Sequence, residues 1–294
     1  MNVTGVGLGL RWEFLDRLIE ELPKSVDFLE ISPENYIGRG GYHPAALEWL
    51  AERYPILTHG LTMSLGGVEP LDEAYLAELR GFIERVKSPF HSDHLCFGSA
   101  ARDGGASVLL HDLLPIRFSE EGARRVADRV KRAQDALGVP MAVENISYYV
   151  HPGRASMSEP EFVSRVCELA DCGLMLDVNN AYVNSQNFGF DVDEWMRAAP
   201  LERTVQIHVA GHDVFDEGDF VPSAKGKKLI LDTHGADVPD PVLALLERVL
   251  PRTGPVPVLL ERDQAIPELP ALLEELGRVR AVYERVFAPV ARSA

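Results

Sequence analysis

The sequence predicts an α/β protein, a single (β/α)8 TIM barrel that spans residues 1–294 as one domain. Eight short segments alternate with amphipathic or charged helical segments, which is the pattern of parallel strands joined by crossover helices. Most of the short segments are continuous apolar runs, as expected for strands buried on both faces of a sheet. The third observation is that the apolar runs repeatedly end in one His, Asp or Glu. A chain of 294 residues suits such a barrel, which typically has about 250 residues.

The first half of the chain supplies four of the eight strands. We expect them at Val3–Leu10, Val26–Ser32, Pro55–Ser64 and Pro89–Phe97. The connecting helices are predicted over about Trp12–Leu22, in a short segment ending at Arg53 after a loop from Pro33 to His43, and over Leu71–Val86. Gly5, Gly7 and Gly9 alternate along the first strand without a GxGxxG motif that opens a helix. Close packing of a barrel strand is therefore favoured over a dinucleotide site.

The second half follows the same alternation after a polar loop that ends at Pro115. The next helix, Ser119–Leu137, begins with an N-cap serine and two glutamates, which suit a helix N-terminus. Four further strands are expected at Pro140–Ser147, Gly173–Val178, Thr204–Ala210 and Pro257–Arg262. Their helices are placed at Ser158–Ala170, about Asp193–Ala198, about Pro241–Leu250 and up to about Phe287. The long loop before Pro241 contains one extra apolar piece, Leu229–Leu231.

The bulk composition is that of a globular protein and excludes several classes. The chain is 46% hydrophobic and 25% charged, with a net charge of −16, which argues against a broad nucleic-acid surface. No apolar stretch approaches the roughly 18 residues that would cross a bilayer, and the N-terminus lacks a signal-peptide pattern. Three cysteines without zinc-finger spacing suggest reduced thiols. We therefore expect a cytoplasmic protein that binds neither nucleic acid nor membrane.

The polar residues at the strand ends form the candidate site. Active sites of such barrels lie at the carboxyl ends of the strands. Seven strands contribute one residue each to that end, namely Glu30, His59, His94, Glu144, Asp177, His208 and Glu261. Four more candidates follow in the loops, Asn180, His212, Asp232 and His234. Asp232 and His234 are two residues apart in a segment that looks extended, so both side chains can point the same way.

Several carboxylates and imidazoles in one cavity favour divalent metal ions. Without a cation, like charges would raise one another's pKa sharply. Mixed His and carboxylate ligands suit Fe, Mn or Zn, and no thiolates converge on the site. Because the ligand count exceeds the needs of one ion, the simplest interpretation is a cluster of two or three metals bridged by Glu144. The predicted ligands are His59, His94, Glu144, Asp177, Asn180, His208, Asp232, His234 and Glu261, of which Glu144, Asp177, His208 and Glu261 are also the catalytic candidates.

Four residues have a less definite role. Glu30 is either a further ligand or a structural ion-pair partner. Asp93 could orient His94 from behind. Asn145, which follows Glu144, and His212 are additional candidates for ligands or for partners of ligands.

Five segments resemble the multinuclear non-haem iron-dependent oxidase family, long known as a domain of unknown function, which includes the methanobactin-biosynthesis oxidase. The segments are His91-Ser92-Asp93-His94-Leu95, Val143-Glu144-Asn145-Ile146-Ser147, Leu176-Asp177-Val178-Asn179-Asn180, Ile207-His208-Val209-Ala210-Gly211-His212 and Asp232-Thr233-His234-Gly235. The resemblance extends from Gly5 to about Glu261. The family is related to the xylose-isomerase-like barrels, including endonuclease IV. Where endonuclease IV has a His three residues after its Asp, this chain has Asn180, which agrees with the oxidase pattern.

The resemblance implies two or three irons, in mixed Fe(II)/Fe(III) states, that activate dioxygen. Family members modify cysteine, and in some cases other residues, of ribosomally made precursor peptides, beginning with oxidation of a metal-bound thiolate. Glu144, Asp177, His208 and Glu261 would surround one iron, and His59 and His94 would complete a second with Glu144 as the bridge. Asn180 with Asp232 and His234 would hold a third. The resemblance also implies a separately encoded peptide-binding partner protein.

Other functions remain open from the sequence. A metal-dependent phosphodiesterase or sugar isomerase of the same barrel superfamily is the second candidate, with zinc or manganese as the metal. A non-enzymatic metal-binding protein is the third. The basic cluster Lys225–Lys228 could contact an acidic leader peptide, or it could be a solvated turn, which we favour.

Overall fold

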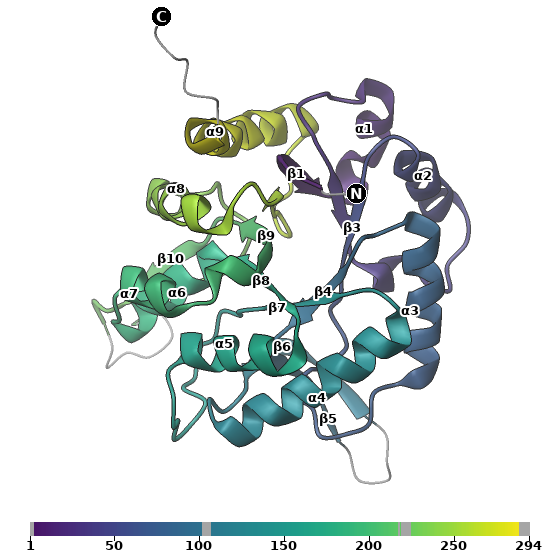
Figure 1. Ribbon diagram of the computed structural model, residues 1–294. Coiled ribbons are helices and arrows are strands. Elements are labelled where there is room, and N and C mark those ends of the chain that lie inside the picture. Colours follow the sequence, from purple (N-terminus) through teal and green to yellow (C-terminus); the bar gives the residue numbers. More distant parts are fainter. Residues whose placement is uncertain (1–2, 102–106, 217, 219–224, 288–294) are drawn as a thin grey trace, which may run out of the picture.

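A closed barrel of eight parallel strands forms the centre of the molecule (Figure 1). The structure, a computed structural model, describes residues 3–101, 107–216, 218 and 225–287. The strands follow one another around the barrel in the order β1-β12-β9-β8-β7-β4-β3-β2, and β2 pairs again with β1. Their bounds are β1 Val6–Gly9, β2 Leu29–Ile31, β3 Ile56–His59, β4 His91–His94, β7 Met141–Glu144, β8 Gly173–Asp177, β9 Thr204–Val209 and β12 Val258–Leu260. The predicted (β/α)8 barrel is confirmed, with strands shorter than predicted.

Helices surround the barrel on its outside (Figure 1). Their bounds are α1 Leu15–Glu21, α2 Tyr42–Ala51, α3 Glu73–Val86, α4 Glu120–Leu137, α5 Glu159–Ala170, α6 Val178–Phe188, α7 Val192–Ala198, α8 Asp240–Thr253 and α9 Leu269–Phe287. Short 3-10 turns lie at η1 Trp12–Phe14, η2 Pro33–Asn35 and η3 Leu201–Arg203. Ser119 caps α4 by accepting a hydrogen bond from the Gly122 amide at 3.1 Å, as its position predicts. In the part of the chain that the structure describes, no helix is long and apolar enough to cross a membrane.

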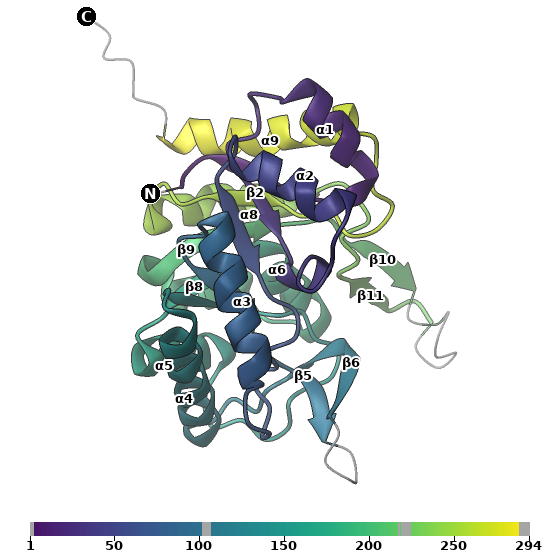
Figure 2. The same cartoon turned by 90° about the vertical axis from the view of Figure 1, so that its right-hand side faces the viewer.

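Two hairpins extend from the same end of the barrel, where loops were expected (Figure 2). Strands β5 (Cys96–Ala101) and β6 (Ser107–Pro115) pair antiparallel after β4, so the prediction of a polar loop up to Pro115 is wrong. Strands β10 (Asp213–Asp216) and β11 (Lys228–Leu231) form the second hairpin, which includes the apolar piece Leu229–Leu231. The sequence pattern of a two-stranded hairpin is weak because neither strand is buried on both faces.

Helix α6 was also missed. Its sequence is rich in Asn and Ser, which favour caps and turns over helix interiors. The helix nevertheless begins directly after β8, because the Asp177 carboxylate caps it by accepting a hydrogen bond from the Asn180 amide at 2.5 Å. The predicted loop residues Asn179 and Asn180 therefore lie in the first helical turn, next to the barrel mouth.

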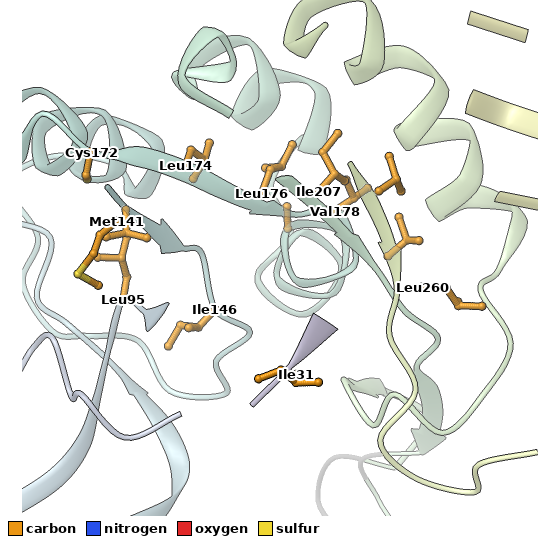
Figure 3. Packing of buried hydrophobic residues seen from close by; sticks show 14 of the residues in the cluster. Ile31, Leu95, Met141, Ile146, Cys172, Leu174, Leu176, Val178, Ile207 and Leu260 are labelled. Carbon is orange, nitrogen blue, oxygen red and sulfur yellow. The ribbon is translucent and has the colours of Figure 1, made fainter. Parts of the chain in front are cut away.

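The apolar core has two parts. The larger part fills the space between strands and helices, and Figure 3 shows Leu174 and Leu176 on the helix-facing side of β8. A smaller cluster of Phe28, Leu57 and Leu259 is separate from it. A Cβ atom on Gly7 would lie 2.7 Å from the Phe28 ring, so the glycine permits close packing there, as the sequence suggested.

Strand alternation explains why the apolar strands end in polar residues. Phe28, Leu57 and Leu259 each precede a candidate site residue by two positions, and residues two apart on a strand point to the same face. Glu30, His59 and Glu261 therefore lie on the same face of the sheet as the small apolar cluster, one layer closer to the carboxyl ends of the strands. The barrel interior has an apolar floor and a polar mouth.

The buried carboxyl of Glu159, at the start of α5, makes stability depend on pH. Burial raises its pKa to about 7, although hydrogen bonds from Trp195 Nε1 (2.9 Å) and Tyr148 Oη (3.3 Å) oppose the rise. Because the unfolded pKa is about 4.3, this group lowers the stability of the fold as the pH rises from about 4 to about 7.

We expect Glu159→Gln to raise the melting temperature at pH 8, because the amide oxygen can still accept the Trp195 bond without a buried charge. The gain should be on the order of 3 kcal/mol at pH 8 and near zero at pH 4. Thermal unfolding at both pH values measures this, and an equal gain at the two would contradict the buried-charge explanation.

Candidate metal centre

The predicted residues converge at the carboxyl end of the barrel, around a cavity of about 510 Å³. The cavity is walled by the strand ends, by the first hairpin and by the loop after β11. The predicted residues that line it are His59, His94, Glu144, Asn180, Asp232, His234 and Glu261. Asp177 and His208 are fully buried beside them. The sequence-based expectation that these side chains share one mouth is thus met in the structure.

Three groups of buried donor atoms could each hold a metal ion. Within each group, every ligand atom lies within 4.8 Å of the others. Glu144 belongs to the first two groups and Asp177 to the last two, so the groups form a continuous chain. They are His59, His94 and Glu144; then Glu144, Asp177 and His208; then Asp177, His234 and Glu261. The structure groups Glu261 with Asp177 and His234, whereas the sequence analysis placed it around the same iron as Glu144, Asp177 and His208. Glu261 Oε2 nevertheless also lies 3.1 Å from His208 Nδ1.

The first group has the dimensions of a coordination site. His59 Nε2 lies 3.2 Å from His94 Nε2 and 3.3 Å from Glu144 Oε2, and the third side, His94 Nε2 to Glu144 Oε2, is 3.1 Å. Two donors each about 2.1 Å from one ion are about 3.0 Å apart at a right angle and about 3.4 Å apart at a tetrahedral angle. The triangle therefore matches one face of a tetrahedral or octahedral site.

Ser92 fixes the tautomer of His59. The Ser92 hydroxyl lies 3.3 Å from the Thr58 carbonyl, to which it donates, and 3.0 Å from His59 Nδ1. Because the hydroxyl proton is used on Thr58, the serine oxygen accepts the proton of Nδ1. The lone pair of His59 is then on Nε2, which faces His94 and Glu144, as a metal ligand requires.

Glu30 plays the same part for His208. Its Oε2 lies 3.1 Å from His208 Nε2 and accepts a hydrogen bond from Gln206 Nε2 at 2.6 Å. The opposite nitrogen, His208 Nδ1, lies 3.1 Å from Glu261 Oε2 and 3.7 Å from Glu144 Oε1. The geometry thus favours the ion-pair alternative for Glu30, which orients the imidazole while Nδ1 faces the cavity.

We expect Glu30→Gln to weaken metal binding about 10- to 100-fold, the usual effect of removing a carboxylate behind a ligating histidine. The substitution conserves volume, so folding should be preserved. Titration of the metal-free protein with Zn(II) or Fe(II) measures the change, with Glu78→Gln, at an exposed position on α3, as the matched control. Equal affinities for Glu30→Gln and the wild type would show that Glu30 is only structural.

The third group depends on an unusual backbone at His234. Asp232 and His234 do approach each other, with Asp232 Oδ1 2.8 Å from His234 Nε2. The reason given by the sequence is wrong, however, because His234 has φ 49° and the segment is not extended. A positive φ is costly for a residue with a Cβ atom. The chain turns at His234, and this turn brings the two side chains together.

Unpartnered buried atoms provide a further test of the fit. Glu144 Oε2, Asp177 Oδ2 and Asn180 Oδ1 are all buried, and none has a hydrogen-bond donor in the structure. Buried acceptors of this kind are costly unless a donor or a cation satisfies them. All three lie at the cavity or within the donor groups, so their chemistry fits metal ions.

The electrostatics of the centre also suit cation binding. Burial lowers the pKa of His94 to about 4 and the pKa of His59 well below its usual value, so both rings are neutral near pH 7. Burial raises the pKa of Glu144 well above its usual range, and burial together with the charge of Asp232 raises the pKa of Asp177 to about 7. A metal ion would bind the neutral rings directly and displace protons from the two carboxyls.

The remaining candidates support the site from outside. Asn145 exchanges two hydrogen bonds with the backbone of Asp177, at 2.8 and 3.0 Å, and so ties β7 to β8. Asp93 accepts a hydrogen bond from the His94 amide at 2.7 Å, but its carboxylate lies 4.0 Å from the His94 ring. The structure therefore does not support the prediction that Asp93 orients that ring. His212 Nδ1 lies 2.7 Å from Asn179 Oδ1, and His212 is in none of the three donor groups.

Sequence reasoning missed the side chains that hold Asp232. Ser147 Oγ donates to its Oδ2 at 2.9 Å, and Asn179 Nδ2 donates to its Oδ1 at 2.6 Å. Asp263 and Arg11, which contact His234 and Glu261, were also missed. Their position in the sequence could have revealed Ser147 and Asp263, because both follow a strand end by a few residues, as the identified candidates do.

The comparisons with known proteins agree with this geometry. A family model described as "RiPP precursor modification enzyme MbnB/TglH/ChrH" matches residues 5–284. The chain belongs to this family. Relatives of this chain include a "UPF0276 protein" of Shewanella loihica, 40% identical over 294 residues and covering 100% of both chains. Another, from Pseudomonas aeruginosa, is 45% identical over 284 residues, covering 96% of this chain and 94% of its own. The family consists of enzymes that modify ribosomally synthesised precursor peptides, and this chain is a member of it.

Solved structures place the fold among xylose-isomerase-like TIM barrels. One from Mycobacterium smegmatis, solved in complex with magnesium, has a TM-score of 0.62 at 11% identity and covers 97% of this chain and 98% of its own. The 3-keto-D-glucoside 4-epimerase of E. coli has a TM-score of 0.58 at 12% identity, with 95% and 99% covered. At these identities the likeness shows the fold alone.

Proposed function

We propose that this protein is a multinuclear iron-dependent oxidase that uses dioxygen to modify cysteine, or another residue, of a ribosomally made precursor peptide. One observation carries the proposal: three buried donor groups joined by Glu144 and Asp177 at the mouth of a barrel of this enzyme family. Iron is favoured because oxidation needs a redox-active metal, whereas zinc supports only Lewis-acid chemistry. Dioxygen would accept the electrons, and the peptide residue would donate them.

The three donor groups would hold the two or three irons of this proposal. We assign the first to His59, His94 and Glu144 and the second to Glu144, Asp177 and His208, with Glu261 beside it. The third would be held by Asp177, His234 and Glu261, with Asp232 within reach of His234. Asn180 Oδ1 is an unpartnered acceptor at the same cavity and remains a proposed ligand. Zinc or manganese could substitute for iron without supporting the oxidation.

The protein side chains would prepare the site for the substrate. Glu144 and Asp177 would release their protons on metal loading, and the neutral rings of His59 and His94 would bind without proton release. Leu110, Leu113 and Tyr149 line the same cavity and would shield a bound peptide residue from water. When bound, iron would supply the means to activate dioxygen beside the substrate.

We also propose the setting of the reaction. A partner protein would bind the precursor peptide, as the family resemblance implies. Cys96, Cys167 and Cys172 are all free thiols and buried, which agrees with a reducing cytoplasm. Lys225, Lys227 and Lys228 are exposed where the chain enters β11, of which Lys228 is the first residue, and this exposure agrees with a solvated turn.

The direct test is metal analysis with Mössbauer spectroscopy on protein expressed with iron and purified without oxygen. We expect two or three irons per chain, some of them antiferromagnetically coupled, and dioxygen uptake on addition of a cysteine-bearing peptide encoded beside the gene. If only zinc or manganese binds, whatever the iron supply, the oxidase is wrong and a phosphodiesterase or sugar isomerase would be the better hypothesis. Iron binding without dioxygen uptake, with every neighbouring peptide tested, would favour a metal-binding protein.

A further inference from the structure

His234 lies between two aspartates that have different surroundings. Asp232 Oδ1 is 2.8 Å from Nε2, and Asp263 Oδ2 is 2.9 Å from Nδ1. The Asp232 side chain is 8% exposed, lines the cavity and makes no ion pair with Lys or Arg among the described residues. Asp263 is 42% exposed at the rim of the cavity. The two carboxylates therefore have different charge compensation although both contact the same ring.

Arg11, which follows β1, neutralises Asp263. Its Nε donates to Asp263 Oδ1 at 3.2 Å, and its Nη2 makes a short contact with the same oxygen. Nη2 also lies 3.9 Å from Glu261 Oε1. A carboxylate already paired with a guanidinium is a poorer metal ligand than a free one, but it remains a good acceptor for an imidazole N–H.

Hydrogen bonds hold the backbone around His234 in place, so only the orientation of its imidazole ring remains to be set. The His234 amide donates to the Gly211 carbonyl at 3.1 Å, and the His234 carbonyl accepts from the Asp263 amide at 3.0 Å. Arg262 Nη1 donates to the next carbonyl, that of Gly235, at 2.6 Å. Because these bonds fix the backbone, the side-chain contact with Asp263 decides which ring nitrogen faces the cavity.

We propose that Asp263, held by Arg11, is the positioning residue of the third metal position. Asp263 accepts the proton of His234 Nδ1, which also lies 3.5 Å from Glu261 Oε2. Nε2, 2.8 Å from Asp232 Oδ1, is then the nitrogen left to bind a metal ion. Two other histidines have the same arrangement, since Ser92 lies behind His59 and Glu30 behind His208. This inference rests on the proposed function, because it assumes that the His234 group binds metal.

The test counts metal ions in the wild type and in Asp263→Ala after anaerobic loading with Fe(II) alone or Zn(II) alone. We expect the variant to bind its weakest ion about 10- to 100-fold less tightly than the wild type does, and to keep the others at unchanged affinity. With ⁵⁷Fe, the Mössbauer spectrum should lose one component. Asp263→Glu, which retains the carboxylate, should recover part of the lost affinity, and Arg11→Gln should cause a smaller loss than Asp263→Ala.

Asp128→Ala, at an exposed position on the outer helix α4, is the matched control and should bind metal as the wild type does. Thermal unfolding verifies that Asp263→Ala is folded, as expected for a residue at the rim. If Asp263→Ala binds every ion as tightly as the wild type, the positioning role is wrong while the metal cluster stands. A wild-type chain that binds no metal would instead overturn the cluster, and the positioning role with it.

Discussion

Glu144→Gln is expected to abolish activity together with metal binding at the two donor groups that share Glu144, while the barrel still folds. Glu144 is the carboxylate that the first two donor groups share, and its Oε2 has no hydrogen-bond donor. The substitution removes the bridging charge with almost no change in volume. We expect metal affinity and peptide-dependent dioxygen uptake to fall by at least about 100-fold, more than for loss of a residue behind a ligand. Metal analysis measures metal binding, dioxygen uptake measures activity, and circular dichroism verifies folding.

The same substitution should not destabilise the metal-free protein. Burial raises the pKa of Glu144 well above its usual range, so replacing it with a neutral amide removes a group that is costly to ionise. His151→Ala, at an exposed loop position, is the control and should keep both metal and activity. Full iron occupancy and turnover in Glu144→Gln would show that Glu144 is not the bridge.

Removal of one tightly bound metal ion is expected to lower the melting temperature by roughly 8 °C. A ligand present at about 1,000 times its dissociation constant stabilises by about 4 kcal/mol, and each kcal/mol corresponds to about 2 °C in a chain of this size. Thermal unfolding with and without a chelator measures the effect. Glu144→Gln should respond to the chelator much less than the wild type does, which separates metal loss from any direct action of the chelator.

The stabilisation by metal should grow as the pH rises. Burial, with the charge of Asp232, raises the pKa of Asp177 to about 7, above its unfolded value of about 3.9. Below that folded pKa the carboxyl is protonated, which stabilises the metal-free fold and opposes the metal ion; above it the proton no longer competes. The difference in melting temperature between loaded and chelated protein should therefore be larger at pH 7.5 than at pH 5.5. The same difference at both pH values would mean that Asp177 is not a ligand.

Local pattern was enough to predict the barrel and most of its polar mouth. The strands of a barrel are apolar because both faces are buried, and a lone His, Asp or Glu at the carboxyl end of such a strand breaks the pattern. His59, Glu144 and Asp177 were identified in this way, and the structure brings them together in shared donor groups. The motifs around them also carried the resemblance to the family, which the match over residues 5–284 confirms.

Elements that depend on partners distant in sequence were not predictable. The two hairpins are stable only because their strands pair with each other, and α6 begins at a polar sequence only because Asp177 caps it. For His234 the expectation of convergence was met for a different reason, since a positive φ rather than an extended strand brings it to Asp232.

The sequence by itself therefore determined the fold class and the types of residue at the mouth, because strand burial and alternation are local properties of the chain. Only the tertiary structure decided how the metal-donor side chains are grouped and which residue contacts the second ring nitrogen of each histidine. Ser92, Glu30 and Asp263 each meet a different histidine through contacts between separate strands and loops. Sequence spacing carries no information about such contacts, because the direction of an imidazole lone pair depends on a hydrogen bond formed only after the barrel closes.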